Sequence, residues 1–199
     1  WALGLWNGGA TGGPANTNTA WGNAQAETWL MWGFRLGFYP MGFIPYVEGD
    51  WAVSQDPKFG IAGSYFSDST QANAAGKNPN VSRWEIDAVL CWMGLYLTGE
   101  YHSITADKNF TGAKDLTDTG WFAQAGYFIM PQELEVLLKY SMLEDDPGNQ
   151  LSEFAIGLAY YLNGHEWKVI GEFGMVNVAP KVGKDTDNSF FRLVLQADW

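Results

Sequence analysis

Charged side chains recur at every second position in several stretches of this chain, and their spacing is what suggests chemistry. In segment 83–92, for example, Arg83, Glu85 and Asp87 alternate with large apolar residues. Successive side chains of a β-strand point to opposite faces, so such a segment has one charged face and one apolar face. Charges that line a water-filled passage attract or repel ions by Coulomb forces. The pattern therefore predicts the wall of an aqueous pore.

The candidate pore-lining residues share this alternating position on an expected strand. The basic ones are Arg35, Arg83, Lys139, Lys168 and Arg192, the acidic ones are Glu85, Asp87, Glu100, Glu135, Glu153, Glu172 and Asp198, and His102 lies among them. Two interpretations stay open for each residue. The charge either tunes the ion selectivity of a pore, or pairs with a neighbouring strand and keeps the wall polar. Because the acidic members outnumber the basic ones, we expect weak or no anion preference.

Aromatic residues on the same expected face form a second candidate feature. They are Trp6, Trp29, Phe66, Phe122, Phe128, Tyr161 and Phe190. A continuous aromatic track would stack against sugars or aromatic solutes. The alternative is that these rings fill the wall locally or pack against an inward-folded loop.

The residue types that catalysis or metal binding would need are sparse. The chain has two histidines, His102 and His165, and one cysteine, Cys91, which lie far apart in the sequence. Metal sites usually show closely spaced Cys or His ligands, and no such spacing occurs here. We therefore expect no enzymatic activity, no cofactor and no metal site.

The elements that must position these residues are β-strands. Alternation predicts about ten of them, and the expected ranges are 1–7, 29–39, 58–68, 83–92, 95–104, 120–130, 133–144, 152–162, 166–177 and 189–199. The Pro/Gly-rich stretch 40–57 is expected to bend the chain. The other connections alternate between tight turns near 93–94, 131–132 and 163–165 and longer loops near 8–26, 69–81, 106–119, 145–151 and 178–188. Transmembrane β-barrels alternate short periplasmic turns with long extracellular loops in this way.

Composition supports a barrel and excludes several other classes. Aromatic residues make up 16% of the 199 residues, while charged residues make up only 17%. No run of 18 or more apolar residues is present, so a helical membrane protein is not expected. The net charge of −11 and the absence of a basic run argue against a nucleic-acid partner. A soluble β-sandwich or lipocalin-like barrel also alternates, but this many large aromatics would overfill its interior.

Two long segments carry a family resemblance. GWFAQAGYFIMPQELEVLLKYSMLEDD (120–146), followed by SEFAIGLAYYLNGHEWKV (152–169), resembles the C-terminal region of the phosphate-selective porin O and P family. WALGLWNGG (1–9), the strand with Arg35 and EGDWAVSQDPKFGIAGSYF (48–66) are similar to earlier parts of that region. The final alternating stretch ends on Trp199, and a terminal aromatic helps to mark such barrels for assembly.

The resemblance implies an antiparallel transmembrane β-barrel in the outer membrane of a Gram-negative bacterium, with a periplasmic C-terminus. Family members are about twice this length and form sixteen-stranded barrels that assemble as trimers. We therefore expect residues 1–199 to be a single domain that is the C-terminal portion of a larger barrel. A closed ten-stranded barrel is the alternative.

The partners implied are outer-membrane lipid and lipopolysaccharide, two further copies of the chain in a homotrimer, and small hydrophilic solutes. The expected function is passive diffusion of ions and such solutes, phosphate or other anions among them. The rival hypothesis is a non-conducting structural or adhesion barrel whose loops bind a partner.

Overall fold

The computed structural model describes residues 1–7, 30–42, 44, 49–69, 80–108, 114–163 and 166–197. All of the secondary-structure elements in these ranges are strands. They are β1 (Ala2–Asn7), β2 (Leu30–Phe38), β3 (Lys58–Ser69), β4 (Asn80–Trp92), β5 (Leu95–Ala106), β6 (Leu116–Met130), β7 (Leu134–Glu144), β8 (Gln150–Asn163), β9 (Trp167–Ala179) and β10 (Thr186–Ala197).

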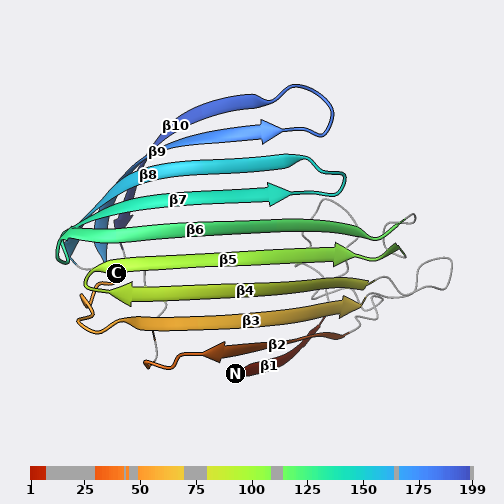
Figure 1. The fold of residues 1–199 in the computed structure, drawn as a ribbon, viewed down its shortest axis with the longest axis horizontal. Coiled ribbons are helices and arrows are strands. Elements are labelled where there is room, and N and C mark those ends of the chain that lie inside the picture. Colours follow the sequence, from red (N-terminus) through yellow and green to blue (C-terminus); the bar gives the residue numbers. More distant parts are fainter. Residues whose placement is uncertain are drawn as a thin grey trace. The chain divides into compact units, whose positions relative to one another are not determined.

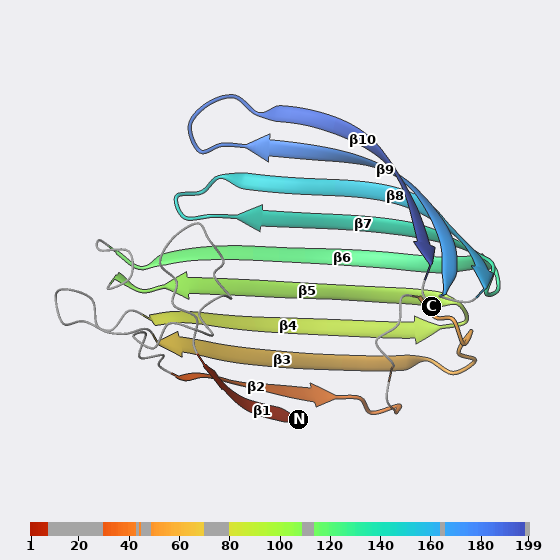
Figure 2. The same cartoon turned by 180° about the vertical axis from the view of Figure 1, so that it is seen from behind.

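The strands form one sheet in which each hydrogen-bonds to its neighbours in the sequence. The order runs from β1 to β10 without a crossover (Figure 1, Figure 2). The recorded registers of β1 with β2 and of β6 through β10 are all antiparallel. Among the described residues β1 and β10 are not paired with each other, so this sheet is open. The part of the chain that the structure describes holds no helix with the length and apolarity of a membrane span.

Every strand that the alternation predicted is present, which confirms the all-β expectation for the described residues. Several strands extend beyond the expected ranges at their loop ends. β6 begins at Leu116 rather than at 120, and β4 begins at Asn80 rather than at 83. Backbone hydrogen bonds continue past the stretch of regular alternation because the ladder is made by the main chain. Alternation therefore located the strands but not their ends.

Tight turns join the strands where the sequence predicted them. Met93 and Gly94 link β4 to β5, and both have positive φ angles, of 50° and 83°. Positive φ at both central residues is typical of the type I′ turn, whose twist matches that of paired strands. Gln132, between β6 and β7, also has a positive φ, of 63°. The expected turn residues 164–165, with His165, lie outside the described residues.

Backbone contacts divide the chain into two compact units. The first comprises Trp1–Leu36, Gly63–Glu85 and His102–Asp118, and the second comprises Gly37–Ala62, Ile86–Tyr101 and Thr119–Trp199. Within the first unit the buried side chains include Ser64, Ser67 and Ser103. Within the second, Phe128, Ala159 and Tyr161 form a buried cluster on which Trp51, Leu137 and Ile170 pack. This buried apolar cluster thus belongs to the second unit.

Candidate functional site

The registers place the expected charged residues of β7 to β10 on one face of the sheet. Lys139 of β7 lies opposite Ala155 of β8, and Glu172 of β9 lies opposite Arg192 of β10. Residues directly opposite in an antiparallel pair share a face, and so do residues two apart in one strand. We call this the polar face, and the face carrying Leu138, Ile156 and Phe173 the apolar face. This alternation is the one that the sequence predicted.

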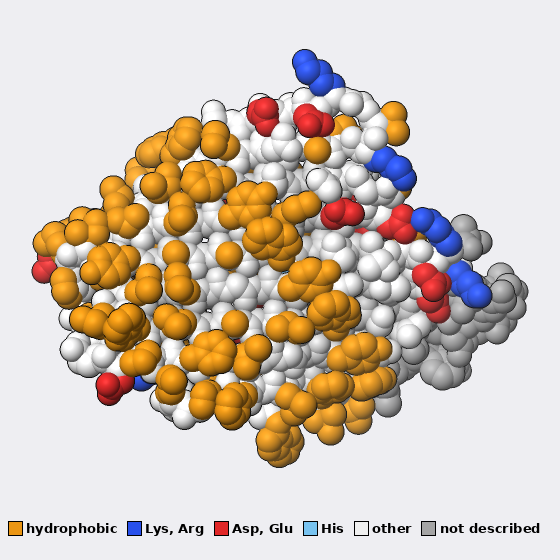
Figure 3. Space-filling view, in the orientation of Figure 1, with side chains coloured by type: hydrophobic (Ala, Val, Ile, Leu, Met, Phe, Trp, Pro, Cys, Tyr) orange, Lys and Arg blue, Asp and Glu red, His pale blue; other side chains and the backbone are white. Residues whose placement is uncertain are grey.

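The apolar face carries large exposed side chains along its length. Figure 3 shows hydrophobic side chains spread over much of the visible face, with the visible charged side chains toward the strand ends. Examples from three neighbouring strands are Leu138, Ile156, Leu158, Phe173 and Met175, each of which is exposed.

On the polar face of the first unit, a charged cluster joins four strands. Arg35 Nη1 donates to Glu85 Oε1 at 3.1 Å, and Ser64 Oγ donates to Glu85 Oε2 at 3.3 Å. His102 Nδ1 lies 3.7 Å from the same Oε2 atom. Arg35 is on β2 and Glu85 is on β4, so the pair reaches across β3. The structure brings together three of the expected site residues here.

Two further pairs lie on the polar face of the second unit. Lys139 Nζ is 3.4 Å from Glu153 Oε1, and Arg192 Nη2 is 3.8 Å from Glu172 Oε1. The Arg192 guanidinium also stands over the Phe190 ring, 5.0 Å from its centroid. All four charged side chains keep partial solvent exposure, so each pair contributes about 0–1 kcal/mol to stability. These four residues are thus paired with a charge on the neighbouring strand.

Glu135 and Lys168 lie on the expected face, but they do not contact solvent. Their exposed fractions are 1% and 2%. Tyr161 donates its hydroxyl proton to Glu135 Oε2 at 2.6 Å, and the Lys168 ammonium lies 5.8 Å from the centre of the Tyr161 ring. This burial differs from the exposed position that we expected of wall residues, and for Glu135 the cover includes Gly49. Charged groups at this depth are stabilised by the polar groups around them.

The remaining expected wall residues differ in their exposure to solvent. Arg83 is exposed on β4, while Asp87 of β4 and Glu100 of β5 are half-buried. Asp198, the last expected wall residue, and the terminal Trp199 lie outside the described residues.

The segment that covers Glu135 is the connection before β3, which the sequence suggested only as a bend. Trp51 packs on Phe128 and Tyr161, with ring centroids 5.7 Å and 5.0 Å apart. Gly49 lies so close that a Cβ there would stand 2.8 Å from Glu135 Oε1. Phe128 and Tyr161 therefore pack against an inward-folded segment, which was the alternative to an aromatic track.

Asp50 is the residue that sequence reasoning missed. Its exposed fraction is 4%, and its Oδ2 accepts hydrogen bonds from the backbone N–H of Ser54, at 2.8 Å, and of Gly94, at 2.9 Å. The sequence feature that could have identified Asp50 is the run Gly49-Asp50-Trp51. Glycine and aspartate both favour turns, and an aspartate side chain can accept a hydrogen bond from nearby backbone.

Other expected aromatics lie over glycines of the adjacent strand. A Cβ on Gly174 would collide with the ring of Phe190, its partner in the β9–β10 register, and a Cβ on Gly33 would collide with the ring of Phe66. These rings fill the space that glycine leaves open, as in aromatic rescue of strand glycines. Trp29 and the side chain of Trp6 lie outside the described residues.

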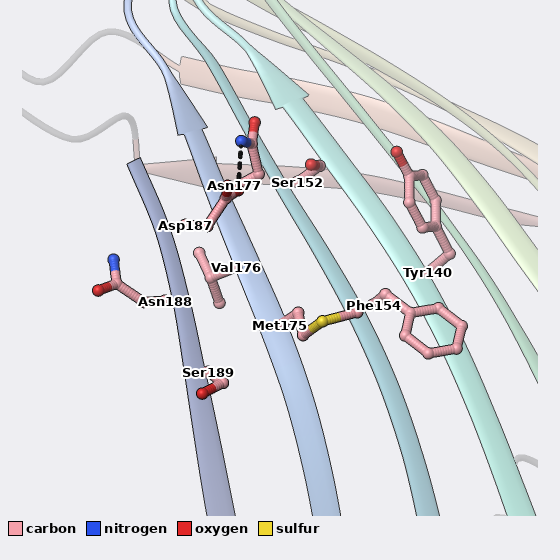
Figure 4. A pocket seen from close by; sticks show the side chains of 9 residues that line it. All are labelled: Tyr140, Ser152, Phe154, Met175, Val176, Asn177, Asp187, Asn188 and Ser189. Carbon is pink, nitrogen blue, oxygen red and sulfur yellow. Dashed lines mark hydrogen bonds between the residues drawn. The ribbon is translucent and has the colours of Figure 1, made fainter. Parts of the chain in front are cut away.

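A shallow groove on β7 to β10 marks the boundary between apolar and polar surface. Tyr140, Phe154 and Met175 lie along three neighbouring strands, and Asn177 donates to Asp187 at 2.7 Å beyond them (Figure 4). The groove also includes Ser152, Val176, Asn188 and Ser189 and has a volume of about 510 Å³. It carries no cluster of catalytic groups, and among the described residues no set of Cys, His, Asp and Glu side chains is arranged to hold a metal ion.

No family model, no curated protein and no solved structure matches this chain.

Proposed function

We propose that this protein is a porin of the Gram-negative outer membrane, through which ions and small hydrophilic solutes diffuse passively. In this proposal the ten strands form all or part of a transmembrane β-barrel, and the polar face lines its aqueous passage. The observation that carries it is the two-faced sheet, with charged pairs on one face and large exposed apolar side chains on the other. Lipid on one side and water on the other would satisfy both faces.

The length of the apolar face supports this proposal. On β8 the exposed apolar residues run from Phe154 to Leu162, which at ~3.4 Å per residue spans roughly 27 Å of strand. The apolar band of outer-membrane barrels is about 25 Å tall. The run is therefore long enough for most of the hydrocarbon core, with strand tilt reducing its height.

Aromatic residues near both ends of the apolar face add support. Trp121 and Tyr140 are in ring contact toward the loop ends of β6 and β7, with centroids 5.2 Å apart. Tyr160 and Trp167 are exposed toward the turn ends of β8 and β9. Barrels in membranes carry aromatic girdles at both interfaces, where amphipathic rings contact lipid headgroups.

The same proposal includes membership of the phosphate-selective porin O and P family, assembly as a trimer and a periplasmic C-terminus. It rests on the resemblance of 120–146 and 152–169 to that family.

The proposed passage favours neither anions nor cations strongly, because Arg35, Lys139 and Arg192 each lie beside a carboxylate. We therefore propose that phosphate and other anions pass through the channel, with no preference over cations.

A second candidate is a non-conducting barrel with a structural or adhesive role. The observation that favours it is residues 49–57, part of which covers Glu135 on the polar face. A lumen occluded in this way would pass no current.

Planar-bilayer recording of the purified protein distinguishes these candidates. A porin inserts in discrete steps, each adding the same large conductance, and the current reverses near zero potential in a salt gradient when selectivity is weak. A protein that enters lipid without conducting would exclude the porin and favour the adhesive barrel. A protein that stays in the aqueous phase of a detergent partition would exclude both and favour a soluble sheet.

A further inference from the structure

Residues 49–57, which we call the strap, bind three separate parts of the second unit. The backbone N–H of Met93, in the β4–β5 turn, donates to the Ser54 carbonyl at 2.7 Å. Gln132 Nε2, in the β6–β7 turn, donates to the Trp51 carbonyl at 3.1 Å. The Trp51 ring packs on Phe128 of β6 and Tyr161 of β8. The strap therefore crosses the polar face at the turn ends of these strands.

A buried carboxylate holds the strap in this position. Asp50 accepts hydrogen bonds from the backbone N–H and the hydroxyl of Ser54, within the strap, and from the backbone N–H of Gly94, outside it. A carboxylate that accepts several N–H and O–H bonds gains strong charge-assisted interactions. The Gly94 bond therefore ties the strap to the β4–β5 turn.

The strap backbone is strained at one point. Val53 has a φ of 46°, and its N–H donates to the Asp50 carbonyl at 2.9 Å to close a tight turn. A β-branched residue rarely adopts positive φ, and such strain persists only where surrounding contacts hold it. Loss of the contacts of Asp50 or Trp51 would release this strain and favour an open strap.

The single cysteine of the chain lies where the strap meets β4. Cys91 is on the polar face of β4, two residues before Met93, and its exposed fraction is 4%. Asp50, in the strap, and Lys58, the first residue of β3, are both close enough to act electrostatically on its thiol. Access of a polar reagent to Cys91 therefore reports whether the strap is in place.

We infer that the strap is a constriction, held closed by Asp50 and Trp51, that narrows the passage at the turn ends of the strands. The inference rests on the proposed function, since it names the segment that limits the size of the permeant solute. Residues 49–57 would exclude solutes that the rest of the polar face would admit.

The test replaces Trp51 in the full-length chain, because Trp51→Ala removes a strap contact without changing any charge near Cys91. The reagent is a cationic, water-soluble methanethiosulfonate, applied to protein reconstituted in phosphatidylcholine vesicles. We expect at least a tenfold faster modification of Cys91 in Trp51→Ala and a larger single-channel conductance in planar bilayers. The matched control, Trp92→Ala, removes an exposed tryptophan from the apolar face beside Cys91 and should leave the modification rate close to that of the wild type.

Trp51→Phe keeps an aromatic ring between Phe128 and Tyr161 and should restore slow modification, provided circular dichroism shows the same sheet content in all variants. Slow modification of Cys91 in both Trp51→Ala and the wild type would overturn the strap as a cover. Fast modification with unchanged conductance in a conducting protein would overturn the constriction but leave the porin standing. Absence of conductance in every variant would overturn the porin and the constriction together, while the Cys91 rates would still decide whether the strap covers β4.

Discussion

The Tyr161 hydroxyl donates a hydrogen bond to Glu135 Oε2 at 2.6 Å, and this short contact joins β7 to β8 beneath Trp51. Glu135 has an exposed fraction of 1%, so its carboxylate depends on protein groups rather than on water for stabilisation. The pair therefore converts a charged position of the polar face into part of the core of the second unit.

Removal of the hydroxyl should destabilise this unit. We expect Tyr161→Phe to lower the free energy of unfolding by about 1–3 kcal/mol, because the buried carboxylate loses a donor. Urea unfolding of protein in vesicles, followed by tryptophan fluorescence, measures the change. Tyr140→Phe, which removes a hydroxyl from an exposed ring on the apolar face, serves as the control. Equal effects of the two substitutions would show that the Glu135 bond contributes no specific stability.

Two glycines of β9 should respond differently to the same substitution. A Cβ at Gly174 collides with the Phe190 ring, whereas a Cβ at Gly171 meets no atom within 4 Å. Gly174→Ala should therefore cost about 1–3 kcal/mol through overpacking, while Gly171→Ala should be neutral or slightly stabilising because strand glycines are entropically costly. Urea midpoints of the two variants check this, and a neutral Gly174→Ala would show that Phe190 moves aside freely.

Ion selectivity should depend on the balance of the Arg35–Glu85 pair. We expect Glu85→Gln to shift the permeability ratio toward anions and Arg35→Gln to shift it toward cations, each by roughly two- to fivefold, because each leaves one uncompensated charge. Reversal potentials across a salt gradient measure both shifts. The double variant is the control and should return close to the wild-type ratio. A strong anion preference that disappears on neutralising Arg35, Arg83 and Arg192 would contradict the expectation of weak selectivity.

The turn between β7 and β8 should be sensitive to acid. Hydrogen bonds from the Asn149 side chain and from the Asn149 and Gly148 backbone hold the pKa of Asp145 below its ordinary value. Asp145 then binds a proton at lower pH in the folded turn than in the unfolded chain. Its contribution to stability is complete above the ordinary carboxyl pKa and is lost as the pH falls through the lowered value.

Asn149→Ala should raise the pKa of Asp145 toward its ordinary value. The turn should then lose stability at a higher pH than in the wild type. An NMR titration of the Asp145 carboxyl carbon checks the direction, with exposed Asn188→Ala as the control. An unchanged titration in Asn149→Ala would show that the backbone donors alone account for the shift.

The strand content could be predicted from the sequence because alternation is a local property. Apolar residues such as Phe154, Ile156 and Leu158 recur with period two, and this spacing identifies both the strand and its apolar face. The turn at Met93 and Gly94 was also predicted, from the short interval between two alternating segments. The same local pattern placed Lys139, Glu153, Glu172 and Arg192 together on the polar face.

Tertiary structure decided which charges meet each other and which contact water. Arg35 pairs with Glu85 across an intervening strand, and no local pattern specifies such a partner. Glu135 and Glu153 occupy equivalent alternating positions, yet Glu135 is buried because the strap returns across it and Glu153 stays half-exposed. Alternation reports the face of a side chain, whereas burial depends on chain that is distant in sequence, which here means Asp50 and Trp51.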